Sequence, residues 1–180
     1  TRILDKKSRE KFYLTEELMM ENAAQELESC VMPHVFHESS RYINRPCVLI
    51  LAGRGNNGAD GYALARRLSC HDFCVAVCCI GEPSSEIAKV QKKRAELLGV
   101  SFISPYDLDS FVEEKSFDIS VVVDCVYGSG FHLPLDAESE AVIQSANKIE
   151  AFKVSCDVPS GLDSDGNGKI VFRADETVAM

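Results

Sequence analysis

The segment Val48–Leu68, VLILAGRGNNGADGYALARRL, contains the pattern that decides the fold of this chain. An apolar run leads into the glycine pattern G-x-G-x-x-G at positions 53–58, and a helical stretch follows. Glycines at this spacing are typical of a dinucleotide-binding loop, because they allow a tight turn and close approach of the backbone to a pyrophosphate. However, Asn56, Asn57 and Asp60 crowd the place where a dehydrogenase presents bare backbone to phosphate. The segment predicts a strand, a ligand-binding loop and a helix, and it leaves the chemistry open.

Apolar runs and helical patterns alternate along the rest of the chain. Strands are predicted at 47–53, 73–80, 100–103, 118–125, 152–158 and 176–180, and helices at 15–33, 60–68, 84–98, 108–112 and 137–149. The main strand patterns are continuously apolar, which indicates a parallel sheet covered on both faces. In helix 84–98 the expected buried face consists of Ile87, Val90, Leu97 and Leu98. The predicted fold is an α/β, Rossmann-like three-layer αβα sandwich with a mostly parallel central sheet.

Composition favours one domain over residues 1–180, since 180 residues with 46% hydrophobic content suffice for one core. The net charge of −9, with no basic cluster longer than Lys92–Arg94, argues against a nucleic-acid partner. No apolar run is long enough to cross a membrane. The eight cysteines form no C-x-x-C pair, which favours structural thiols in a reducing, cytoplasmic compartment. A closing helix is expected after the last strand, so the domain is predicted to be truncated at its C-terminus.

Polar residues cluster directly after three of the predicted strands. The clusters are residues 56–61, 123–135 and 156–163. Ligands of open parallel sheets bind beyond the carboxyl ends of the strands, so the clusters are expected to converge there. Each also has a purely structural interpretation: Asp60 would cap a helix, and Asp124 and Asp157 would accept hydrogen bonds from the following loops. Three polar clusters at the same edge of the sheet favour a binding site.

A dehydrogenase is the first hypothesis that the glycine loop suggests, and the sequence argues against it. Such an enzyme requires an acid about twenty residues after the glycines to hold the ribose, and Glu82 is a weak candidate. Asp60 would place negative charge beside the pyrophosphate, where a helix N-terminus offers a positive field. The four histidines show no clear catalytic partners. The loop is therefore expected to serve another reaction.

Three motifs carry a resemblance to a known family. GRGNNGADGYALARRL (53–68), VVDCVYGSGF (122–131) and CDVPSGLDSDGN (156–167) closely resemble segments of the NAD(P)H-hydrate epimerases, whose domain is the YjeF N-terminal domain. The flanking segments LMMENAAQEL (18–27) and ADETVAM (174–180) are similar as well. The resemblance implies an isomerase that interconverts the two C6 epimers of hydrated NADH or NADPH in cofactor repair. It also implies a homodimer and a partner dehydratase, often fused to this domain in bacteria.

The resemblance assigns roles to individual residues. Contacts to the hydrated dinucleotide are expected from Asn56, Asn57, Gly58, Ala59, Asp60, Gly128, Ser129, Gly130, Phe131, His132, Leu133, Pro134 and Asp157. A potassium ion, K+, is expected at Asn57, Asp124 and Ser160, whose amide, carboxylate and hydroxyl oxygens suit a hard cation. Inversion at C6 requires proton transfer, and Asp157 is the candidate catalytic residue. The assignment predicts that the three potassium ligands and Asp157 gather around one oxygen-lined hollow.

The chain departs from the family pattern at two positions. Ala59 stands where glycine is common, and His132 stands where lysine is frequent, so anion contact at His132 would depend on pH unless this residue is simply solvated. The alternative function is a non-catalytic nucleotide-binding or protein-interaction scaffold of the same fold. All three clusters retain their polar residues, which favours the enzyme.

Overall fold

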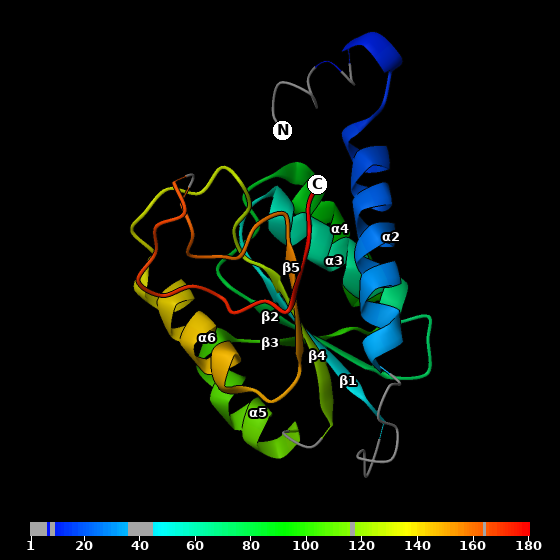
Figure 1. The fold of residues 1–180 in the computed structure, drawn as a ribbon. Helices are drawn as coiled ribbons and strands as arrows, with labels where there is room; N and C mark the ends of the chain where they lie inside the picture. Colours follow the sequence, from blue (N-terminus) through cyan, green and yellow to red (C-terminus); the bar gives the residue numbers. More distant parts are fainter. Residues whose placement is uncertain (1–6, 8–9, 36–44, 116–117, 164) are drawn as a thin grey trace.

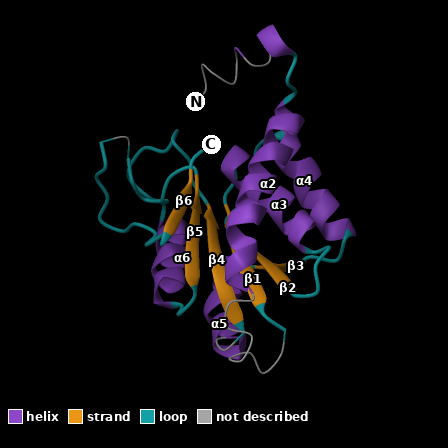
Figure 2. Ribbon diagram, turned by 45° about the vertical axis from the view of Figure 1, so that its right-hand side comes forward, coloured by secondary structure: helices purple, strands orange, loops and turns teal. Residues whose placement is uncertain are grey.

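The sheet of this protein is entirely parallel. The computed structural model describes residue 7 and residues 10–35, 45–115, 118–163 and 165–180. The strands are β1 (Cys47–Ala52), β2 (Cys74–Cys79), β3 (Ser101–Ile103), β4 (Ile119–Cys125), β5 (Phe152–Cys156) and β6 (Glu176–Val178). Figure 1 shows the course of the chain through these elements, and in the sheet the strands lie in the order β3-β2-β1-β4-β5-β6 (Figure 2). This is the strand order of the Rossmann fold, whose topological switch point falls between the first and fourth strands.

Helices cover both faces of the sheet, as Figure 2 shows. One face carries α2 (Glu16–Val35), α3 (Asn56–Leu68) and α4 (Glu86–Leu97), and the other carries the 3-10 helix η1 (Pro105–Asp107), α5 (Leu108–Lys115) and α6 (Ala137–Lys148). Strand β1 is buried along its whole length: Val48, Ile50 and Ala52 join the core under α2 and α3. Its alternate residues Leu49 and Leu51 join the core under α5 and α6. The predicted three-layer sandwich is confirmed.

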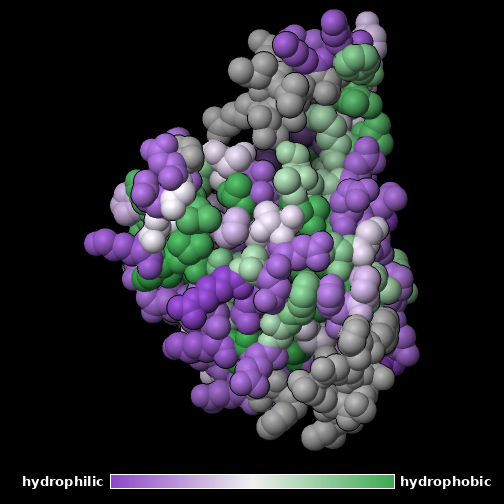
Figure 3. Space-filling view, in the orientation of Figure 1, coloured by the Kyte–Doolittle hydropathy of each residue, from purple (hydrophilic) through white to green (hydrophobic). Residues whose placement is uncertain are grey.

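On the face seen in Figure 3, hydrophilic residues cover the region of α5 and α6. Among the described residues, no helix is both long enough and apolar enough to cross a membrane.

Several helix boundaries differ from the prediction, and those of α3 and α2 have a clear structural basis. Helix α3 begins at Asn56 rather than at residue 60, because Gly55 takes an extended conformation (φ −93°, ψ −161°) and starts the helix without a side-chain cap. Asn56 and Asn57 consequently lie in its first turn. Helix α2 continues through Pro33 to Val35. A proline this close to the end removes one backbone hydrogen bond and leaves the preceding turns intact.

The expected buried face of α4 is wrong. Val90, Leu97 and Leu98 are 45%, 74% and 53% exposed, whereas the residues that the helix buries are Ala88, Gln91 and Ala95. Ala88 packs in a cluster with Ala59 and Ala63 of α3. Small side chains on both helices let their backbones approach closely, and this contact, not the hydropathy of single residues, sets the orientation of α4.

The buried amide of Gln91 provides a test of this packing. Its Nε2 lies 3.5 Å from Glu21 Oε1, and among the described residues its Oε1 has no hydrogen-bond partner. Because an unsatisfied buried acceptor is unfavourable, Gln91→Met should raise the free energy of unfolding by about 1 kcal/mol. Thermal denaturation should show a Tm increase of about 2–4 °C. Val90→Met at the neighbouring exposed position is the control, and a lower Tm for Gln91→Met alone would contradict the interpretation.

Candidate functional site

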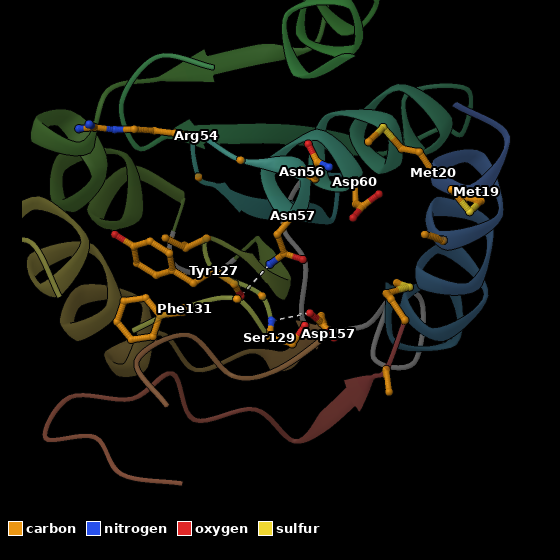
Figure 4. A pocket seen from close by; sticks show the side chains of 18 of the residues that line it. Met19, Met20, Arg54, Asn56, Asn57, Asp60, Tyr127, Ser129, Phe131 and Asp157 are labelled. Atoms are coloured by element: carbon orange, nitrogen blue, oxygen red, sulfur yellow. Dashed lines mark hydrogen bonds between the residues drawn. The ribbon is translucent and has the colours of Figure 1, made fainter. Parts of the chain in front are cut away.

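A pocket of about 1020 Å³ opens at the carboxyl ends of β1, β4 and β5, at the topological switch point. Its walls come from the first half of α2, the β1–α3 loop with the start of α3, the loop after β4, and Asp157 after β5 (Figure 4). Ala179 and Met180 complete the lining. The three polar clusters predicted from the sequence therefore meet at one edge of the sheet.

The glycines of the β1–α3 loop serve close packing of the backbone. The Gly53 N–H donates to the Cys125 carbonyl at 3.1 Å, and a Cβ at Gly53 would overlap the Val126 carbonyl. A Cβ at Gly58 would in turn overlap the Gly53 carbonyl. The loop is thus pressed against the end of β4 on one side and against α3 on the other. Substituting either glycine would separate these elements.

Two of the expected substrate contacts lie behind the pocket wall. Gly58 and Ala59 are buried, and neither lines the pocket. Ala59 packs instead against Met20 and Ala24 of α2. Because α3 begins at Asn56, position 59 falls on the face of the helix that contacts α2 and α4. Ala59 supports the wall, and its departure from glycine is accommodated by this packing.

The three expected potassium ligands are joined by hydrogen bonds. Asp124 and Ser160 are fully buried. Ser160 donates to the Asp124 carboxylate through its backbone N–H and its Oγ, each at 2.7 Å. Tyr127 connects them to Asn57: its N–H donates to Ser160 Oγ at 2.9 Å, and its carbonyl accepts from Asn57 Nδ2 at 2.8 Å. Burial raises the pKa of Asp124 to about 6, although the hydrogen bonds from Ser160 oppose the shift.

Asp157 is held in the pocket by an unusual backbone conformation. Its φ of +69° lies in the left-handed region, which non-glycine residues rarely adopt outside turns and functional sites. This conformation directs Oδ2 toward the loop after β4, where it accepts the Ser129 N–H at 2.6 Å. A Cβ at Gly128 would lie 2.6 Å from the same oxygen. A side chain at position 128 would therefore displace the Asp157 carboxylate from its place beside the Ser129 N–H.

Asp60 is the second carboxyl group of this part of the pocket. It lies one turn into α3 and lines the pocket, opposite Met19 and Met20 of α2 (Figure 4). Burial raises the pKa of Asp60 to about 8, and the negative charge of Asp157 adds to the shift. Asp60 is therefore mostly protonated at neutral pH. The sequence suggested that it would bring a negative charge to this loop, and burial removes that charge.

The loop after β4 divides into a part that lines the pocket and a part that does not. Gly128, Ser129, Gly130 and Phe131 line it, and the Phe131 ring packs on that of Tyr127 with centroids 4.4 Å apart. His132, Leu133 and Pro134 are exposed and lie outside the lining. Their expected contacts with substrate stay predictions, which would require the loop to close over the ligand.

Several lining residues were not predicted from the sequence. They are Glu16, Met19, Met20, Asn22, Ala23 and Glu26 from α2, Arg54, Ile80, Val126, Tyr127 and Asp136 near the loops, and Ala179 with Met180. The segment 18–27 stood out only as a similar flanking segment. The role of α2 in the pocket follows from its position beside α3. Just before that segment, Glu16 Oε1 accepts a hydrogen bond from Asn56 Nδ2 of α3 at 3.0 Å.

The strand order and the pocket at the switch point place this chain in the class of Rossmann-like α/β domains. Residues 16–180 match the model of the family described as YjeF-related protein N-terminus, and the chain belongs to this family. It is 37% identical over 178 residues to the bifunctional NAD(P)H-hydrate repair enzyme Nnr of Helicobacter pylori, covering 98% of this chain and 35% of that enzyme. It is 36% identical over 147 residues to the NAD(P)H-hydrate epimerase of Oenococcus oeni, covering 78% and 66% respectively.

The fold also agrees with a solved structure. The crystal structure of the yeast protein ynu0 matches with a TM-score of 0.84 at 22% identity, covering 99% of this chain and 76% of that one. This likeness establishes the shared fold. The chain spans about a third of the bifunctional relative and just under two thirds of the epimerase.

The raised pKa of Asp60 predicts a pH-dependent stability. From about pH 4 to pH 8 the folded protein binds a proton that the unfolded chain lacks, so the free energy of unfolding falls as pH rises through this range. Asp60→Asn removes the buried ionisation and should stabilise the protein at pH values above 8 by at least about 1.4 kcal/mol, the equivalent of one pKa unit. Thermal denaturation should then show a Tm about 3–6 °C higher.

The exposed Asp72, which pairs with Arg45 at 2.7 Å, is a suitable control position. Asp72→Asn should change the Tm little at any pH. Equal pH dependence of Tm in the wild type and in Asp60→Asn would show that Asp60 is ionised in the folded protein at neutral pH.

Proposed function

We propose that this chain catalyses epimerisation at C6 of hydrated NADH and NADPH, as an isomerase of nicotinamide cofactor repair. The observation that carries the proposal is the convergence of Asn57, Asp60 and Asp157 in one pocket at the switch point of the sheet. The relatives named NAD(P)H-hydrate epimerase support it. The volume of about 1020 Å³ suits a dinucleotide, since pockets for small molecules and cofactors are about 300–1,000 Å³.

The chemistry of C6 agrees with the two carboxyl groups. C6 of the hydrate bears a hydroxyl and the ring nitrogen, so it inverts when its C–O or C–N bond breaks and re-forms on the opposite face. Either route moves a proton to and from the departing atom. Asp157 is the proposed acid–base group. The protonated Asp60 is a second proton donor in the same pocket, and the contrast between the two environments is typical of acid–base pairs.

The residues around Asn57 suit a potassium ion. Asp124 supplies a carboxylate, Ser160 a hydroxyl and Asn57 an amide, which are oxygen donors that a hard cation prefers. The Tyr127 carbonyl lies 3.4 Å from Ser160 Oγ and accepts a hydrogen bond from Asn57 Nδ2 at 2.8 Å, so binding of the cation would turn the Asn57 amide to present its oxygen instead. When bound, the cation would neutralise the buried Asp124 and hold the loops after β1, β4 and β5 together.

A dehydratase is the proposed functional partner. The chain aligns with about a third of the bifunctional repair enzyme, which supports a second activity acting on the same hydrate. An epimerase supplies that partner with the one epimer it accepts, so both epimers are cleared. A homodimer is likewise proposed from the family resemblance.

The function is tested by adding the protein to one purified epimer of the hydrate and following the other by chromatography. Wild-type protein should bring the two epimers to equilibrium faster than the uncatalysed rate. Asp157→Asn should slow this reaction by about 10²–10⁴-fold, the usual contribution of a general acid or base. Asparagine tolerates the left-handed conformation and can accept the Ser129 N–H, so the fold should be retained.

An unchanged Tm for Asp157→Asn is the control for folding. Epimerisation at the wild-type rate by Asp157→Asn would remove this residue from the mechanism. Absence of epimerisation by the wild type with either hydrate would contradict the proposed function.

Potassium is tested by thermal denaturation in potassium and sodium salts of equal ionic strength. A concentration about ten times the Kd should stabilise the folded protein by about 1.4 kcal/mol, or about 3–6 °C in Tm. Ser160→Ala should abolish the difference between the two salts. Ser155→Ala, which removes a 3.4 Å hydrogen bond to the same carboxylate but no proposed ligand, should retain it. The same Tm for the wild type in both salts would contradict the site.

A further inference from the structure

Arg54 occupies a distinct position in the pocket. It follows Gly53 in the β1–α3 loop, is exposed and lines the pocket. Its side chain lies flat against Gly81, the residue at the end of the β2 segment, where an added Cβ would come within 2.7 Å of Arg54 Cζ. The guanidinium is therefore held over the carboxyl end of β2, one strand away from the end of β1.

Arg54 also differs in charge from the other ionisable residues around it. The described lining residues that carry carboxyl groups are Glu16, Glu26, Asp60, Asp136 and Asp157, and Arg54 is the cation among them. Within the described part of the chain, no hydrogen bond engages the Arg54 guanidinium. The nearby Asp136 carboxylate accepts instead from Tyr127 Oη at 2.7 Å and from the Ser139 N–H at 2.9 Å. Burial acts to raise the pKa of Asp136, but its hydrogen bonds with Ser139 and Tyr127 and the charge of Arg54 lower it, so Arg54 lies within electrostatic reach of this carboxylate. The N–H donors of Arg54 remain open to an anionic group of a ligand.

The position of Arg54 indicates which anionic group it meets. A pyrophosphate is expected at the N-terminus of α3, where Asn56 and Asn57 begin the helix and backbone N–H groups point outward. Arg54 extends away from Asn57, Asp60 and Asp157, past Tyr127 (Figure 4). In Rossmann-like sites the ribose next to the pyrophosphate lies toward the end of the second strand, where an acid binds the 2′-hydroxyl and an arginine accommodates a 2′-phosphate.

The acid at the end of β2 does not serve this role. Glu82 is turned toward α4, where its Oε2 lies 3.5 Å from Lys92 Nζ, and it does not line the pocket. Arg54 takes the place that a ribose-binding acid would otherwise fill. The guanidinium fork matches the geometry of a phosphate, which it binds through two parallel N–H bonds.

We propose that Arg54 binds the 2′-phosphate of the dinucleotide, so that this chain prefers the hydrate of NADPH to that of NADH. The proposal rests on the proposed function for the reaction, and it adds the residue that selects between the two substrates. Asp60 and Asp157 act at the nicotinamide ring, while Arg54 acts at the far ribose.

The test compares kcat/KM for the two hydrates in the wild type, Arg54→Ala and Arg45→Ala. Wild-type protein should favour the NADPH hydrate by about 10- to 100-fold, the range expected for a charge-assisted hydrogen bond. Arg54→Ala should lose this preference through reduced activity with the NADPH hydrate alone. Arg45 precedes β1, at the opposite edge of the sheet from Arg54, and pairs with Asp72, so Arg45→Ala should keep the preference. Arg54→Lys should keep part of it, because lysine retains the charge without the fork.

Equal loss with both hydrates in Arg54→Ala, or no preference in the wild type, would overturn the proposal. Calorimetric titration with NADP+ and NAD+ separates this result from failure of the proposed function. If the wild type epimerises neither hydrate, at least tenfold tighter binding of NADP+ that disappears in Arg54→Ala still supports the role of Arg54. Equal Kd values for NADP+ and NAD+ in the wild type would refute it.

Discussion

The buried carboxylate of Asp124 is the constraint on which the site depends. It lies one residue before the end of β4, in the centre of the sheet, and accepts hydrogen bonds from the Val126 N–H at 3.1 Å and from the Ser160 N–H and Oγ. These donors belong to the loops after β4 and β5, so one acid fixes both loops. Separating the loops would leave a buried carboxylate unpaired, which is strongly unfavourable. The positions of Tyr127, Asn57 and Asp157 follow from this arrangement, because the same two loops carry or contact them.

The net charge of the pocket depends on the same arrangement of loops and helices. A pocket with five carboxyl groups repels an anionic ligand such as the proposed dinucleotide. Burial keeps Asp60 largely neutral, the first turn of α3 directs backbone N–H groups at the pocket, and Arg54 adds a positive charge at the end of β2. The pocket therefore carries fewer negative charges than it has carboxyl groups.

Much of this architecture was predictable from the sequence. Residues such as Val48 and Leu49 lie on opposite faces of β1 and are both buried, so a continuous apolar run correctly indicated a covered parallel strand. The carboxyl ends of parallel strands meet at one edge, which placed Asn57, Asp124 and Asp157 together. The start of α3 was missed because Gly55 has no side chain to signal a cap. The sequence did not predict that Met19 and Met20 line the pocket or that the pKa of Asp60 is raised, because both features arise from the packing of α2 against α3.

Gly128 is a position where a substitution would affect the site but not the packing of the domain. It lies in a loop outside the sheet and the cores, and the space that a side chain would need holds the carboxylate of Asp157. A single methyl group acquired there would push against that oxygen while every strand and helix kept its place. Because Asp157 is the proposed catalytic group, substitution at this one position would alter the site while the shape of the domain stayed the same.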